Sequence, residues 1–214
     1  MVAEKVLCQP LAEKLIEAVE KGTLFQEISP DVDIESGAVT YPEGHDCFLG
    51  RTEGGLSILH LAVRHGQKTV VEEVIKHFPS LVLTADSSGE TPLHFGARLK
   101  KNHPMATTLL QLSKDVVDEF RAEAGPLFLD AVPWRQKNSN GDTPLHEALR
   151  SSNYDMAVNL MDIDSDLSLS ENRAGETPLH ILARYGTYTS KSLVSRMFNI
   201  FICDLSIIVH VDPL

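Results

Sequence analysis

Apolar residues recur along the chain in short blocks with helical spacing, and polar segments separate the blocks. One block is formed by Val70, Val71, Val74 and Ile75. Apolar pairs recur at Leu109–Leu110, Leu160–Met161 and Leu193–Val194. Apolar positions three and four residues apart are typical of a helix that buries one face. The pattern therefore predicts a succession of amphipathic helices whose apolar faces form the core.

A six-residue phrase, Gly-x-Thr-Pro-Leu-His, recurs at 89–94, 141–146 and 175–180. Its glycine suits a hairpin tip that needs a positive φ. The threonine hydroxyl can cap free helix amides, and proline then takes the first helical position, where a missing N–H costs nothing. The phrase therefore predicts a hairpin followed by a helix start. Its structural residues are Thr91, Pro92, His94, Thr143, Pro144, His146, Thr177, Pro178 and His180.

A looser fourth copy of the phrase lies at 55–60. Ser57 can cap this helix, but Ile58 cannot pre-set the first turn as proline does, so we expect the least sharply defined start here. The four motif histidines stand at 60, 94, 146 and 180, which gives intervals of 34, 52 and 34 residues. The middle interval is one period plus about 18 inserted residues.

A period in the low thirties that contains Thr-Pro-Leu-His resembles the ankyrin-repeat family over residues 51–195. The resemblance implies an all-α solenoid of stacked helix-turn-helix units with hairpin loops. It also implies that the motif histidine is a structural hydrogen-bonding residue. We expect repeats at about 51–84, 85–118, 137–170 and 171–204, after a degenerate capping unit and a long loop in residues 1–50.

Two segments depart from this period. The insertion near 113–136 is either a loop that covers the edge of the stack or an addition that supplies specificity. The apolar tail at 196–214 is too short for a membrane helix. We expect it to fold over the last repeat, to be buried in a partner, or to be the edge of a truncated product.

The segment from His77 to Asp86 resembles a plant branch of the ankyrin family. Members of this branch usually continue into a C-terminal membrane-spanning domain and are associated with defence and stress signalling. This chain has no such domain in its sequence, so the branch is the second reading: the cytosolic portion or truncated form of a membrane-anchored regulator.

The charge balance favours some partners over others. The chain carries 19 Lys plus Arg against 30 Asp plus Glu, and its net charge of −11 argues against a general nucleic-acid binder. Cys8, Cys47 and Cys203 are too few and too scattered for a disulfide framework or a zinc site. The N-terminus lacks the features of a signal peptide, so we expect a cytoplasmic protein, at the membrane only through another region or a partner.

The sequence holds no convincing catalytic or metal-binding motif. His146-Glu147 lacks the second histidine of a zinc protease. The acidic run at 162–166 resembles the start of a calcium loop, but Leu167 and Arg173 stand where the loop needs glycine and glutamate. We expect a solvated turn at this run, no cofactor, no metal and no enzymatic activity.

The resemblance implies that partners contact the hairpin tips and the exposed side of the first helices. The tip candidates are Asp86, Glu90, Asn138, Asn140, Asp142, Asn172, Arg173 and Glu176. Phe95, Glu147 and Ile181 follow the motif histidine and differ between repeats, so we expect them to contribute to specificity. Trp134 is a further candidate, in the insertion.

One arginine lies four residues after each motif histidine, at Arg64, Arg98, Arg150 and Arg184. The repeat period predicts that they form a row at the carboxyl ends of the first helices, where the helix dipole favours a cation. The row has either this structural role or a binding role, as a positive groove wall that selects an acidic peptide. The sequence as a whole predicts a non-catalytic protein-interaction scaffold or adaptor, possibly one that acts in signalling.

Overall fold

A computed structural model describes residues 13–21, 31–32, 39–40, 49–99, 103–124 and 132–185. The predicted tail at 196–214 and most of the predicted N-terminal loop lie outside these residues. The chain divides into two compact units, Met1–Pro92 and Leu93–Leu214. The structure confirms the predicted all-α class.

The first unit contains α1 (Glu13–Lys21), β1 (Asp31–Val32), β2 (Val39–Thr40), α3 (Ile58–Arg64), α4 (Lys68–His77) and the 3-10 helix η2 (Pro79–Leu83). Helix α3 packs against both α1 and α4. The two short strands pair antiparallel, with Val32 opposite Val39. The core between the helices includes Leu59, Val63 and Val74, all fully buried.

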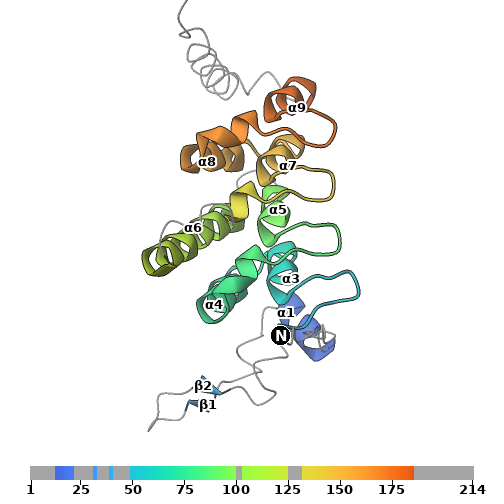
Figure 1. Cartoon of the computed structure of the whole chain (residues 1–214). Coiled ribbons are helices and arrows are strands. Elements are labelled where there is room, and N and C mark those ends of the chain that lie inside the picture. Colours follow the sequence, from blue (N-terminus) through green and yellow to red (C-terminus); the bar gives the residue numbers. More distant parts are fainter. Residues whose placement is uncertain are drawn as a thin grey trace, which may run out of the picture. The chain divides into compact units, whose positions relative to one another are not determined.

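The second unit contains α5 (Pro92–Ala97), α6 (Pro104–Ala124), η4 (Pro133–Arg135), α7 (Pro144–Arg150), α8 (Tyr154–Ile163), η5 (Ser165–Leu169) and α9 (Pro178–Tyr185). Helix α7 packs against α8 and α9, and α6 packs against α8. Figure 1 shows the first helices α5, α7 and α9 in one row, with α6 and α8 beside them and the hairpins on the opposite side.

Helix α6 is the longest element of the described chain. It has 21 residues, whereas α8 in the next repeat has 10. The extra length includes the buried residues Val116 and Val117, and in Figure 1 the far end of α6 projects beyond α8. Part of the inserted sequence therefore lengthens a helix instead of forming a loop.

Polar residues fix where the first helices begin. Thr143 and His146 form a capping box at the start of α7, and Ser57 and His60 form the same box at α3. The expectation of a poorly defined start at Ile58 is wrong, because serine and histidine make the box without proline.

The residue before each second helix joins it to the preceding repeat. Asn153 is buried, accepts from the backbone N–H of Met156 at 3.3 Å, and donates to the carbonyls of Ala97 (3.3 Å) and Leu99 (3.1 Å). In the first unit, the side chain of Gln67 donates to a carbonyl near the end of α1, at 3.0 Å. Helix α1 therefore stands to α3 as α5 stands to α7, in the place of a first helix.

Candidate functional site

Each hairpin is shaped by one polar side chain before its tip. The Oδ1 atom of Asp86 accepts from the backbone N–H groups of Ser88 and Glu90, both at 2.8 Å. Asn138 and Asn172 accept equivalent pairs of bonds at 2.9–3.0 Å. Because one side-chain oxygen satisfies two backbone donors, the tip keeps its shape without a partner.

Two hairpins lie so close to the next hairpin that only glycine fits at their tips. Gly55 and Gly141 have φ values of +77° and +78°. A Cβ atom at Gly55 would lie 2.8 Å from the backbone nitrogen of Ser87, and one at Gly141 would lie 2.7 Å from that of Arg173. The Arg173 N–H donates to the carbonyl of Asn140 at 2.9 Å. The tips in each unit therefore form a hydrogen-bonded series.

The motif histidines join each helix start to the following hairpin. In His146, Nδ1 accepts from the backbone N–H and the hydroxyl of Thr143, at 3.2 and 2.9 Å, and Nε2 donates to the carbonyl of Glu176 at 3.1 Å. The Nε2 atoms of His60 and His94 lie 2.9 and 3.0 Å from carbonyls of the hairpins that follow them. Each bridging histidine thus has both ring nitrogens engaged in the frame.

Burial changes the protonation of these histidines. It lowers the pKa of His60 to about 4, although the bond to the Glu90 carbonyl opposes the shift. It also lowers the pKa of His146, against the bond to Glu176. Both rings are therefore neutral at physiological pH and can accept a proton at Nδ1 only by losing the bond from the helix cap.

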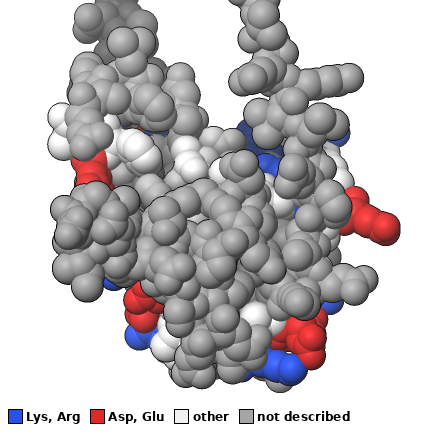
Figure 2. Space-filling view, turned by 90° about the horizontal axis from the view of Figure 1, so that it is seen from below, with Lys and Arg blue, Asp and Glu red and all other residues white. Residues whose placement is uncertain are grey.

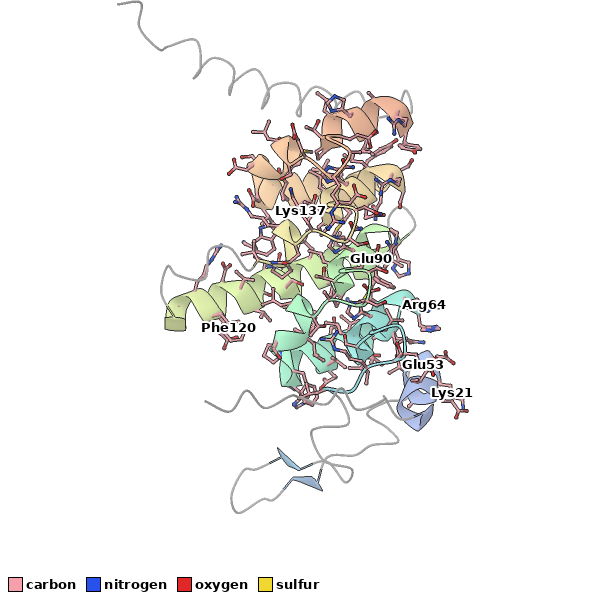
Figure 3. The ribbon with its side chains drawn as sticks, turned by 45° about the vertical axis from the view of Figure 1, so that its right-hand side comes forward. Lys21, Glu53, Arg64, Glu90, Phe120 and Lys137 are labelled. Carbon is pink, nitrogen blue, oxygen red and sulfur yellow. The ribbon has the colours of Figure 1, made fainter. Side chains whose placement is uncertain are left out.

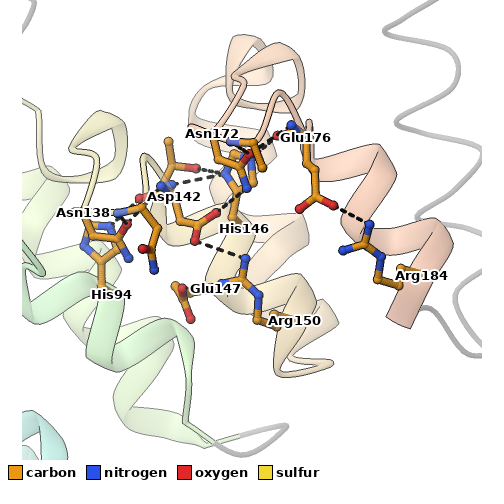
Figure 4. A network of polar contacts seen from close by, with 12 residues as sticks. His94, Asn138, Asp142, His146, Glu147, Arg150, Asn172, Glu176 and Arg184 are labelled. Atoms are coloured by element: carbon orange, nitrogen blue, oxygen red, sulfur yellow. Dashed lines mark hydrogen bonds and ion pairs between the residues drawn. The ribbon is translucent and has the colours of Figure 1, made fainter.

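Four charged side chains meet on the inner side of α7 (Figure 4). Arg150 donates to Asp142 at 3.1 Å and to Glu147 at 2.6 Å, and Asn172 donates to Asp142 at 2.9 Å. Arg98 lies 3.7 Å from the other Glu147 oxygen. Burial alone would raise the pKa of Asp142, but the bonds from Arg150 and Asn172 hold it below the usual value. The buried carboxylates are thus compensated by cations.

The arginines of the second unit are all paired with carboxylates. Besides Arg98 and Arg150, Arg184 lies 2.5 Å from Glu176, and the Arg98 guanidinium lies 4.8 Å above the ring centre of Phe95. In the first unit Arg64 is exposed (Figure 3), and no described residue forms an ion pair with it. The prediction of a uniformly positive wall is not supported in the second unit, because each cation has its own counter-charge.

The candidates differ in their access to a partner. Exposed or half-exposed are Arg64, Arg98, Arg150, Arg184, Phe95, Asp86, Glu90, Asn140, Asn172, Arg173 and Glu176. Buried are Asn138, Asp142, Glu147, Ile181 and Trp134. Ile181 and Trp134 pack as core residues in this structure, and Asn138, Asp142 and Glu147 support the exposed tips from beneath. Sequence periodicity did not separate these two groups, because both occur at regular positions.

Lys137 and Arg51 were not among the sequence candidates. Lys137 donates to the carbonyl of Glu171 at 2.8 Å, and Arg51 donates to that of Ala85, in each case 34 residues further along. A basic residue at the same place in two repeats was the available signal. Asp164 was assigned to a solvated turn, but it is wrong to place it there, since its side chain is 9% exposed and paired with Arg135.

Charges of both signs are interspersed elsewhere on the surface. On the face drawn in Figure 2, Lys and Arg side chains of the described residues lie next to Asp and Glu side chains. Within the described ranges, no group of three His, Cys, Asp or Glu side chains is placed to hold a metal ion. Among the helices described, none is both long and apolar enough to cross a membrane.

Comparison with known proteins agrees with this geometry. The family model for ankyrin repeats, in three copies, matches residues 15–119, which begin inside α1. Protein ACCELERATED CELL DEATH 6 of Arabidopsis thaliana is 27% identical over 133 residues. The match covers 61% of this chain and 19% of that protein, so the chain spans about a fifth of its relative. With repeated hairpins, capped first helices and bridging histidines, the chain belongs to the ankyrin-repeat family and is a protein-interaction module.

Proposed function

We propose that this chain is a non-catalytic ankyrin scaffold or adaptor that binds a protein partner through its hairpin tips and first helices, in the cytoplasm and in a signalling role. The observation that carries the proposal is the preformed series of hairpins. Asn140 and Arg173 expose their side chains while their backbone groups bond to each other. Exposed side chains on a rigid frame bind with little loss of conformational entropy.

The inner helices add contact area next to the tips. Phe95 is half-exposed beneath the Arg98 guanidinium, and Glu147 holds Arg98 and Arg150 from below. Aromatic and arginine side chains are common at the centres of protein interfaces. Because these arginines are already paired, an acidic peptide would compete with Glu147. A partner that offers both an acceptor and an apolar side chain fits this surface better.

The proposal of a non-catalytic role follows from how the reactive groups are used. His60, His94 and His146 each place Nε2 against a backbone carbonyl. A general base needs a free ring nitrogen within reach of substrate, and these rings have none.

Affinity purification from the native source tests the interaction surface. The bait is the full chain carrying Arg173→Glu and Asn140→Ala, changes that alter exposed side chains and leave the backbone bond intact. The control is Lys76→Glu, a charge reversal at an exposed position of α4. We expect the double variant to lose a partner that the wild type and the control both retain, with unchanged thermal unfolding. Equal recovery by all three baits would contradict the proposed surface.

A second candidate function is the cytosolic portion of a membrane-anchored plant regulator of defence or stress signalling. The similarity to Protein ACCELERATED CELL DEATH 6 favours it. Transcripts from the native source test this candidate. A coding sequence that continues beyond Leu214 into several apolar stretches of about 20 residues supports it, and a stop codon after Leu214 in all transcripts contradicts it.

A further inference from the structure

The extension of α6 builds a pocket that the ankyrin frame does not need. A cavity of about 350 Å³ lies between the second half of α6, η4 and the end of α8. Lys114, Asp118 and Arg121 line it from α6, and Trp134, Arg135 and Asp164 line it from the other elements. It lies within the second unit, on helices other than the first helices that carry the proposed partner surface.

One of the three cations in the pocket is fully engaged. The guanidinium of Arg135 donates to both carboxylate oxygens of Asp164, and its Nη2 atom also lies 3.2 Å from Asp166. These bonds raise the pKa of Arg135 above its ordinary value, against the effect of burial. Arg135 therefore forms a fixed wall, and the charge available to a ligand comes from α6.

Lys114 and Arg121 are the less engaged cations. No described residue forms an ion pair with Lys114. The Nη1 atom of Arg121 lies 3.8 Å from Asp118, and its Nε atom, although buried, has no hydrogen-bond acceptor among the described residues. A buried guanidinium N–H without an acceptor is unfavourable. Partly exposed ion pairs such as Arg121–Asp118 contribute little and are readily exchanged.

We propose that this pocket binds an oxyanion group, a phosphate or a carboxylate, carried on a side chain of a partner protein. The oxyanion lies between Lys114 and Arg121, accepts from both, and replaces Asp118 as the partner of Arg121. Two cations outnumber the single carboxylate that α6 contributes, and charge-assisted hydrogen bonds to oxyanions are stronger than neutral ones. The rigid Arg135–Asp164 pair and Trp134 set the size of the site.

The tryptophan provides a direct measurement. Trp134 is the chain's single tryptophan and lines the pocket, so its fluorescence reports occupancy. The full chain is titrated at constant ionic strength with inorganic phosphate, with an acetylated tri-glutamate peptide, and with chloride as the reference. We expect a saturable change with one or both probes and none with chloride. Saturation by phosphate alone assigns the site to phosphorylated side chains, and saturation by the peptide alone assigns it to acidic ones.

Variants separate the pocket from general charge effects. Lys114→Gln removes a cation that has no ion pair among the described residues, so the fold is retained, and it should weaken binding about tenfold. Arg121→Gln should have a similar effect, while Arg121→Lys keeps the charge and restores part of the affinity. Lys76→Gln, the matched control on α4, should bind as the wild type does. A change no different from chloride, or equal affinity of the Lys114 and Lys76 variants, overturns the proposal.

Discussion

The hairpin and helix start at 141–146 and those at 175–180 share one six-residue phrase but have different surroundings. His146 is fully buried and its Nε2 atom reaches the carbonyl of Glu176, whereas His180 is exposed and bonds to Thr177 within its own turn. Gly141 lies against the next hairpin, but no described heavy atom comes within 4 Å of a Cβ built at Gly175. The same phrase therefore contributes differently to stability according to what lies on it.

The largest effect is expected at the two glycines. Gly141→Ala requires a positive φ and places Cβ 2.7 Å from the backbone nitrogen of Arg173. We expect it to lower the free energy of unfolding by about 3 kcal/mol or more, from backbone strain plus overpacking. Gly175→Ala has only the strain, about 1 kcal/mol. Denaturant unfolding of both variants measures the difference, and equal losses would contradict the close approach at Gly141.

The buried histidines predict a loss of stability in acid. The pKa of His60 falls from 6.5 to about 4 on folding. Below pH 6.5 the unfolded chain therefore binds a proton that the folded chain does not, so stability is lost as pH falls towards 4. From the linkage relation the loss approaches about 3 kcal/mol for this residue.

Unfolding free energies measured from pH 7.5 to 4.5 test this prediction. His60→Gln should flatten the dependence on pH, because it removes the group that titrates. His180→Gln, at an exposed position, is the control and should leave the slope unchanged. Parallel slopes for the wild type and the His60 variant would show that His60 does not cause the acid loss.

The arginines sharpen the same comparison with a smaller effect. Arg150→Gln leaves the buried carboxylates of Asp142 and Glu147 without their main cation, and we expect a loss of about 2 kcal/mol. The side chain of Arg184 is 59% exposed, so Arg184→Gln should cost less than about 0.5 kcal/mol despite its pair with Glu176. Thermal unfolding ranks the two, and 0.5 M salt should reduce only the smaller effect.

The smallest effect is expected at Lys137, whose ammonium joins two hairpins from the surface. Lys137→Met removes the 2.8 Å bond to the carbonyl of Glu171, which water can replace, so we expect about 0.5 kcal/mol. Lys76→Met, which touches no hairpin, serves as the reference. A loss above about 1.5 kcal/mol relative to this reference would mean that the bond is more important than its exposure indicates.

Much of the fold followed from local patterns. The phrase with threonine, proline and histidine located the starts of α5, α7 and α9, and the apolar spacing identified α4 and α8. The start of α3 was misjudged because proline was given more weight than the capping box of Ser57 and His60. Among the binding candidates, Glu147 shows why the rest could not be predicted, since its position holds an apolar residue in other repeats.

The sequence by itself determined the period, the hairpins and the helix caps, because these depend on groups within about six residues of one another. Only the tertiary structure decided which histidine is buried, which arginine is paired and which tip excludes a side chain. Those outcomes depend on atoms that arrive from the following repeat, such as the Glu176 carbonyl 30 residues after His146 and the Asp142 carbonyl 48 residues after His94. A local pattern specifies a donor, but burial and charge compensation depend on the acceptor that packing brings to it.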